Sequence, residues 1–219
     1  EENATNYYGQ FALPGNEQWY SLNWGNYVHI TVLNSEADPT AEQLNWLESD
    51  LASHKNYTWK FVLFHHPPFS SGSHGSWIEG QENWCPIFDK YRVDVVFSGH
   101  DHFYERSKPI NYTASKNSSQ DSYSEGTMYL VSGGWGAPLY SSGSNWWIAH
   151  SASVYHFVLV DVFVNGTLNL QAKDTSGLTF DEVYQKLPIV PEFPSLLLAL
   201  LFAMATLLAT KVYKRKSSR

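Results

Sequence analysis

Four histidines stand directly after two apolar stretches of the chain. His65 and His66 follow "WKFVLF", and His100 and His102 follow "VDVVFSG" with one residue between them. Neutral imidazole is the side chain that most often binds metal ions in proteins, so each pair could supply ligands. A histidine in such a place is more often an ordinary surface or core residue, and spacing alone leaves both interpretations open.

The two apolar stretches have the pattern of buried β-strands. Short continuous apolar runs are typical of strands that are covered on both faces. In open α/β sheets, ligands bind where the strands deliver their C-terminal ends. We therefore expect the two histidine pairs to converge on one site, with Gly99 giving the second turn the backbone freedom to present both of its imidazoles.

The neighbouring segments alternate between strand and helix patterns. Residues 25–35 alternate and are rich in β-branched side chains, which predicts a strand. Residues 39–53 predict a helix with Asp38 as its N-cap, and residues 79–91 predict a helix at least in their middle. Three later stretches, beginning "TMYLVSGG", "SVYHFVLV" and "TLNLQAKD", predict an antiparallel meander. This order of elements indicates the α/β fold class.

Composition and charge limit the classes of function. The 219 residues are 43% hydrophobic and 16% aromatic, enough for the core of one domain. The formal net charge is −7 although five basic residues gather in the last nine positions, so the rest of the chain is strongly acidic. Such a surface repels phosphate backbones, which excludes nucleic acid as a partner. The one cysteine, Cys85, can form no intrachain disulfide.

Five Asn-x-Ser/Thr sequons indicate an exported glycoprotein. They lie mostly in polar, turn-like surroundings where a glycan would be tolerated. The acceptor residues are Asn3, Asn56, Asn111, Asn117 and Asn165.

The C-terminal end predicts a membrane anchor. Residues 195–213 carry an uncharged apolar core and one lysine close to the end, and they have the length of a helix that crosses a bilayer. A buried core helix is the alternative, but the stretch shows no polar face and a basic segment, residues 214–219, follows it, as expected on the cytoplasmic side. Residues 187–194 form a proline-rich linker. We therefore expect residues 1–186 to lie on the extracellular face of the membrane.

The same end also resembles the C-terminal sorting signals of archaeal surface proteins. In those signals a Pro-Glu-Phe motif, an apolar helix and a basic end follow one another, and a membrane transpeptidase cuts at the motif. Here the motif is Pro191-Glu192-Phe193. The resemblance implies either a retained anchor or a surface protein whose helix has been removed.

Several segments resemble the calcineurin-like metallophosphoesterase family, in its purple acid phosphatase-like branch. They include "WKFVLFHHPPFSSGSHG", "DVVFSGHDHFYER" and "YLVSGGWGAPLY", in the order and spacing of the family, within residues 7–140. The resemblance implies the C-terminal half of a four-layer αββα sandwich. It also implies a centre of two transition-metal ions, with iron, zinc or manganese as the candidates.

The resemblance assigns roles to individual histidines. His65 and His100 correspond to ligands of the second metal and His102 to a ligand of the first, whereas the family position of His66 is variable. His74 corresponds to a loop histidine that faces the substrate, where it could orient phosphate or protonate a leaving oxygen. The alternative for His74 is an exposed residue of a Gly/Ser-rich loop.

The remaining ligands of the family pattern would precede Glu1. We therefore expect a C-terminal part of a longer precursor that hydrolyses little when produced alone. The leading hypothesis is an extracellular acid phosphatase-like phosphomonoesterase that acts on phosphorylated small molecules. The alternatives are a phosphodiesterase or nucleotidase, a non-catalytic surface or adhesion module, and a single structural zinc whose fourth ligand would be His74 or Asp101.

Overall fold

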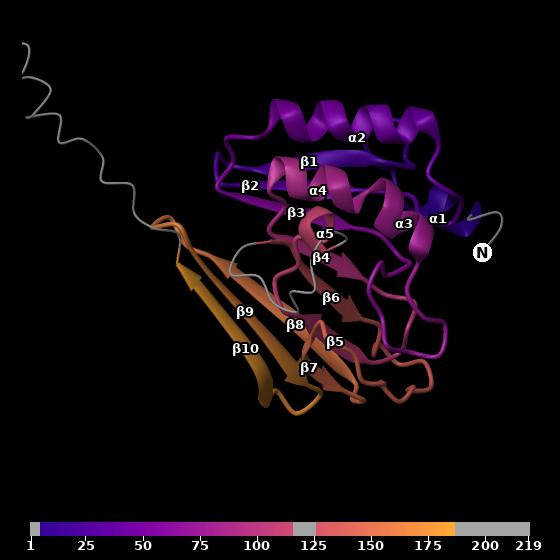
Figure 1. The fold of residues 1–219 in the computed structure, drawn as a ribbon, viewed down its shortest axis with the longest axis vertical. Coiled ribbons are helices and arrows are strands. Elements are labelled where there is room, and N and C mark those ends of the chain that lie inside the picture. The colour runs from indigo at the N-terminus through magenta and orange to yellow at the C-terminus, as the bar shows by residue number, and fades with distance from the viewer. Residues whose placement is uncertain (1–4, 116–125, 187–219) are drawn as a thin grey trace, which may run out of the picture.

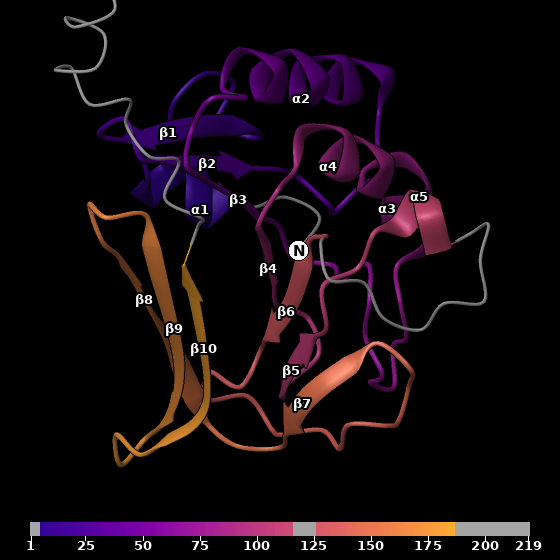
Figure 2. The same ribbon diagram turned by 60° about the vertical axis from the view of Figure 1, so that its left-hand side comes forward.

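The computed structural model of the chain describes residues 5–115 and 126–186 (Figure 1). Helices cover one face of a seven-stranded mixed sheet, and a three-stranded antiparallel sheet packs against its other face (Figures 1 and 2). The helices are α1 (Thr5–Gln10), α2 (Ala41–Ser53), α3 (Ile78–Asn83), α4 (Cys85–Tyr91) and α5 (Tyr112–Ser115). The strands are β1 (Tyr20–Trp24), β2 (Val28–Val32), β3 (Trp59–Leu63), β4 (Val95–Ser98), β5 (Tyr104–Ser107), β6 (Met128–Ser132), β7 (Ile148–Ala152), β8 (His156–Val162), β9 (Thr167–Asp174) and β10 (Thr179–Lys186).

Four parallel strands form the centre of the large sheet. Its order is β1-β2-β3-β4-β6-β5-β7, in which β2, β3, β4 and β6 run parallel and the outer strands run antiparallel to their neighbours. The small sheet has the order β10-β9-β8. Because parallel strands end on the same side, the loops after β3, β4 and β6 lie along one edge of the large sheet.

Two apolar clusters lie on opposite faces of this sheet. Successive side chains of a strand point to opposite faces, so β3 places Val62 toward the helices and Phe61 toward the small sheet. On the helix side the buried residues include Leu47, Leu51, Trp84, Phe88 and Val96. On the other side they include Val28, Trp59, Val95, Leu168 and Leu170.

The predicted α/β order is confirmed. The apolar stretches before the two histidine pairs form β3 and β4, and the helix predicted over 39–53 is α2. The predicted N-cap, Asp38, is wrong. Thr40 caps the helix, because its hydroxyl accepts the main-chain N–H of Gln43 at 3.2 Å.

The predicted antiparallel meander is only partly correct. It holds for β8 and β9, which pair antiparallel, and β10, a strand that we did not predict, extends them. The third predicted strand, β6, instead pairs parallel with β4 inside the large sheet. The other neighbour of β6 is β5, a four-residue strand "YERS" that has no clear apolar pattern. Residues Met128 to Val131 of β6 are buried, and β6 is covered on both faces, as is typical of a parallel strand inside a sheet.

The described residues form three layers, and the fourth layer of the expected αββα sandwich is not among them. The predicted linker, membrane helix and basic tail, residues 187–194, 195–213 and 214–219, lie outside the described residues. Within the described ranges, none of the helices has the length and apolar character needed to cross a bilayer.

A buried ion pair joins the two sheets. Arg106 on β5 donates from Nε to Oδ2 of Asp181 on β10 at 2.6 Å and from Nη2 to Oδ1 at 2.9 Å. The Tyr104 hydroxyl donates to the same carboxylate at 2.7 Å. Burial acts to raise the pKa of Asp181, but the hydrogen bonds from Arg106 and Tyr104 outweigh it and lower this pKa.

We predict that Arg106→Ala lowers the free energy of unfolding by about 2–4 kcal/mol at pH 7, because it leaves a buried carboxylate without its charged partner. Since the folded-state pKa of Asp181 lies below its unfolded value, the stabilisation is present above about pH 4 and is lost as the pH falls through the folded pKa. Urea unfolding of the full-length protein at several pH values measures the deficit. Lys55→Ala, at an exposed cation, is the control. A deficit that stays constant down to pH 3 would contradict this account.

Candidate metal centre

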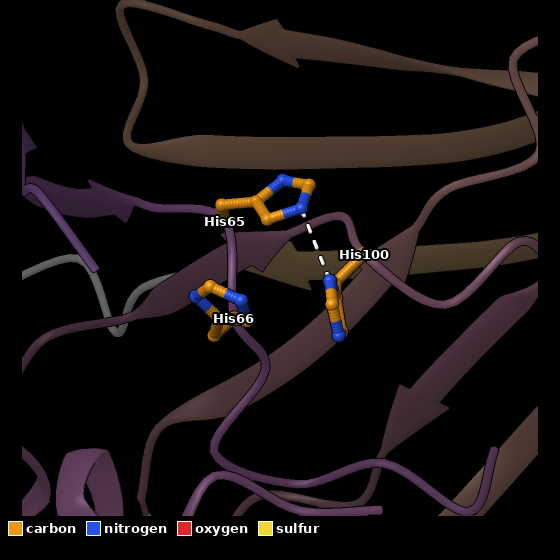
Figure 3. A group of neighbouring side chains, drawn as sticks. All are labelled: His65, His66 and His100. Carbon is orange, nitrogen blue, oxygen red and sulfur yellow. Dashed lines mark hydrogen bonds between the residues drawn. The ribbon is translucent and has the colours of Figure 1, made fainter. Parts of the chain in front are cut away.

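Three histidines meet at the edge of the sheet where β3 and β4 end. His65 and His66 follow β3, and His100 follows β4. Each offers a ring nitrogen, and these nitrogens all lie within 4.8 Å of one another (Figure 3). The convergence of the two loops is thus confirmed for these three residues, including His66, whose place in the family pattern is variable.

The spacing of two of these nitrogens suits one metal ion. Nε2 of His65 and Nδ1 of His100 are 3.1 Å apart. Two ligands of a tetrahedral zinc, each bound at about 2.0–2.1 Å, lie roughly 3.3 Å from each other. The structure joins the two nitrogens by a hydrogen bond, and loss of its proton on metal binding would leave a lone pair on each of them. His65 and His100 therefore fit a shared ion.

Ser35 fixes the turn that carries His65 and His66. Its hydroxyl accepts the main-chain N–H of both residues at 3.0 Å. Its carbonyl lies 2.7 Å from Nδ1 of His66, which must therefore carry the proton. This tautomer leaves Nε2 of His66 free to act as an acceptor or ligand, the arrangement that outer-shell carbonyls give to metal-binding histidines.

The second turn has an unusual backbone at His100. His100 has φ of +66°, in the left-handed region that residues other than glycine rarely adopt. Our expectation that Gly99 would provide the unusual conformation is wrong, because the positive φ falls on the residue after it. Gly99 instead donates its N–H to the His65 carbonyl at 3.0 Å, which joins the two loops. Such strained residues cluster at functional sites.

His102 lies outside the group of three. Its Nδ1 donates to the carbonyl of Pro138 at 2.9 Å, and its ring stacks on Tyr140 with the ring centres 4.3 Å apart. The bond to Pro138 leaves Nε2 of His102 without the proton. His102 is therefore fixed by a main-chain carbonyl, as His66 is, and presents its Nε2 from a different position.

His74 is brought to the same edge by a buried carboxylate. Nδ1 of His74 lies 2.8 Å from Oδ1 of Asp101, and Ser70 donates its hydroxyl proton to the other oxygen. Asp101 is fully buried, whereas the His74 side chain is 45% exposed. The centres of the His74 and His100 rings are 4.5 Å apart. A Cβ on Gly72 would lie 2.5 Å from Cγ of Asp101, so this loop requires glycine there.

A second buried carboxylate anchors the same loop. Glu105 accepts a hydrogen bond from the hydroxyl of Ser71 and one from Nε1 of Trp147 at 3.0 Å. Burial raises the pKa of Glu105, and the hydrogen bond from Ser71 opposes this effect. Neighbouring serines thus each donate to a different buried carboxylate. Sequence analysis missed Glu105, because its polar strand gave no sign of its buried position.

The electrostatics favour a neutral imidazole at His100. Burial lowers the pKa of His100, and the neighbouring His66, His65 and His74 lower it further. A neutral ring offers a lone pair, which metal binding requires. A cavity of about 480 Å³ leads to His65, and its wall includes Glu17 and Glu36. The centre is therefore open to a ligand of moderate size.

A second cluster, formed by His29, Asp50 and His54, has similar spacings but a different orientation. The rings of His29 and His54 are stacked, with their centres 3.8 Å apart and their planes at 11°. Lone pairs in parallel planes cannot point to one ion. The His29 Nε2 instead lies 2.8 Å from Oδ2 of Asp50, so this cluster joins the sheet to α2 by hydrogen bonding.

The chain is similar in sequence to known phosphoesterases. The profile of the calcineurin-like phosphoesterase family matches residues 3–104. "Probable inactive purple acid phosphatase 24" of Arabidopsis thaliana is 32% identical over 177 residues, 74% of this chain and 27% of that protein. "Acid phosphatase A" of Cryphonectria parasitica is 28% identical over 203 residues, 78% of this chain and 37% of that protein.

A solved structure also resembles the chain. The purple acid phosphatase PPD1 from seeds of yellow lupin (Lupinus luteus) superimposes with a TM-score of 0.69 at 27% identity, over 80% of this chain and 34% of that one. The chain thus spans between 27% and 37% of the length of these three relatives.

The names of the relatives include active and inactive phosphatases, so membership of the family assigns no activity by itself. Metal binding is the property that the histidine geometry and the family share. The chain is thus similar to the calcineurin-like phosphoesterase family over residues 3–104, and the relatives compared above are purple acid phosphatase-like proteins.

Proposed function

We propose that the chain supplies part of a metal centre that hydrolyses phosphate monoesters of small molecules. The observation that carries this proposal is the meeting of His65 and His100, with nitrogens 3.1 Å apart, beside the ring of His74. Two loops, the connection between β3 and α3 and the turn after β4, thus bring three imidazoles to one strand edge. The relative named "Acid phosphatase A" supports the reaction class.

The residues divide into metal ligands and a proton donor. His65 and His100 would hold one metal ion, and His102 would hold a second one through Nε2. Zinc, iron and manganese all accept imidazole ligands. Two such ions, when bound, polarise the phosphoryl oxygens and provide hydroxide near neutral pH. The relatives are longer than this chain, and we propose that the anionic ligands of the centre correspond to the part of the relatives that this chain does not cover.

His74 would act on the leaving group. Asp101 holds Nδ1–H of His74 in a hydrogen bond, and with both ring nitrogens protonated His74 would give its Nε2 proton to the departing alkoxide oxygen. The buried position of Asp101 holds the ring in place, because a desolvated carboxylate keeps its few partners. The exposed side of His74 remains accessible to the substrate.

We also propose that the protein acts on the outer face of a membrane. The five sequons and the apolar residues 195–213 support this. Two sequon acceptors, Asn56 and Asn165, lie in exposed turns where a glycan meets no steric obstacle.

We predict that His65→Ala and His100→Ala each remove metal and turnover together from the full-length protein, because each deletes a ligand. Metal content by mass spectrometry and hydrolysis of 4-nitrophenyl phosphate measure the two properties. His150→Gln, at a histidine outside the site, is the control and should retain both. Full metal content in both alanine variants would rule out these ligands.

We predict that His74→Ala lowers kcat by about 10²–10⁴-fold while the metal content stays unchanged, as expected for a proton donor. Asp101→Asn should produce a smaller loss of kcat in the same direction, because it weakens the bonds that hold Ser70 and His74 without removing the proton donor. Ser73→Ala, at the exposed neighbouring residue, is the matched control. Equal activity in wild type and His74→Ala would leave the loop without a catalytic role.

We predict that the protein in its native cells stays with the membrane fraction after carbonate extraction and migrates faster on gels after glycosidase treatment. Asn56→Gln and Asn165→Gln should each remove one step of that mobility shift. A protein recovered without glycans in the soluble fraction would contradict the proposed location.

A further inference from the structure

An aromatic pocket lies beside the candidate metal centre. Its large side chains are Trp135, Tyr155 and Phe157, which are 79%, 41% and 41% exposed. Gly134, Gly136, His156 and Thr175 complete the pocket, which measures about 540 Å³. This volume lies within the range of small-molecule sites, and exposed aromatic groups of this size commonly mark binding surfaces.

We propose that the aromatic pocket binds a flat ring on the alcohol part of the substrate, so that the preferred substrates are phosphate esters of aromatic alcohols. The proposal rests on the phosphoesterase function proposed above, and it names the substrate class of that same site.

Two glycines connect the pocket to the metal centre. A Cβ on Gly133 would lie 2.0 Å from the carbonyl oxygen of Asp101 and 3.3 Å from Cα of His102. A Cβ on Gly134 would lie 2.6 Å from Nδ1 of His156, in the wall of the pocket. Gly133 therefore packs against the turn of Asp101 and His102, and the next residue, Gly134, packs against the pocket wall. Their Cα atoms are about 3.8 Å apart, so the turn and the pocket lie close together.

The loop that carries Trp135 also covers His102. Tyr140 donates its N–H to the His102 carbonyl at 3.0 Å and stacks on the His102 ring. Trp135 follows Gly133 by two residues, so their Cα atoms are at most about 7.6 Å apart, and Gly133 packs against Asp101 and His102. An ester with its phosphate at the histidines could therefore place a ring against Trp135.

The arrangement also follows from the topology. The loop leaves the end of β6, a parallel strand of the same edge that carries His100. In Figure 2, β6 points toward the end of the molecule where β9 turns into β10, and this turn contains Thr175. The pocket is thus built from segments that meet at the functional edge of the sheet.

The chemistry of the pocket favours a flat ring over a sugar. A sugar needs several hydrogen-bond partners, but both ring nitrogens of His156 already have one. Nδ1 lies 2.8 Å from the carbonyl of Val154, and Nε2 lies 3.0 Å from the hydroxyl of Ser132. Indole and phenyl faces instead attract aromatic rings by stacking.

The test compares Trp135→Ala with Trp24→Ala in the full-length protein, because Trp24 is equally exposed at 79% and lies at the opposite edge of the sheet. The substrates are 1-naphthyl phosphate and methyl phosphate. We expect Trp135→Ala to lower kcat/KM for the naphthyl ester roughly ten-fold or more, as loss of a stacking partner does, and to leave the methyl ester unchanged. Trp24→Ala should change neither value.

A second measurement separates this inference from the proposed function. Binding of 1-naphthol to the metal-depleted protein, followed by calorimetry, needs no catalysis. If wild type hydrolyses neither ester but Trp135→Ala still abolishes naphthol binding, the pocket stands and the phosphoesterase function fails. If hydrolysis is present and Trp135→Ala lowers both esters equally or neither, the pocket proposal is overturned. Binding of methyl glucoside in place of naphthol would also overturn it.

Discussion

Burial of the four central parallel strands on both faces is the constraint on which the rest of the structure depends. β3, β4 and β6 send alternate side chains into two separate apolar clusters, one under the helices and one under the small sheet. β2 contributes Val28 to the second cluster and bonds to α2 through His29 and Thr31 on its other face. A slip of one residue would exchange these two sets, so the register is fixed. Fixed register determines where each strand ends, and the ends of β3 and β4 place His65 and His100 within 3.1 Å of each other.

The polar groups at this edge are organised by two buried carboxylates. Asp101 lies in the turn after β4, and Glu105 lies in β5. The neighbouring residues Ser70 and Ser71 each donate a hydroxyl hydrogen bond, Ser70 to Asp101 and Ser71 to Glu105. A buried carboxylate without hydrogen-bond partners is costly in free energy. The loop that carries Ser70 and Ser71 is therefore held in the position where both bonds form. The exposed His74 gains a defined position from this network, as a preorganised site requires.

The two histidine clusters show that orientation decides what a group of imidazoles can do. Both have ligand atoms within 4.8 Å of one another. In the first cluster the rings of His65 and His100 are inclined at 81°, whereas in the second the rings of His29 and His54 are stacked at 11°. Inclined rings can share an ion, and stacked rings pack. Composition and spacing in the sequence cannot separate the two cases, because ring orientation depends on neighbours from other elements.

The sequence by itself determined the α/β class, the strands before the histidines and the helix after β2, because apolar periodicity is local and needs no partner to be read. It also indicated His65, His100 and His74 through a resemblance. Only the tertiary structure decided that β6 enters the large sheet, because the apolar pattern of a buried strand does not indicate which strands it pairs with. The same holds for His66, Asp101 and Glu105, whose positions depend on contacts between residues far apart in the chain, such as Ser35 with His66 at 2.7 Å and Ser71 with Glu105.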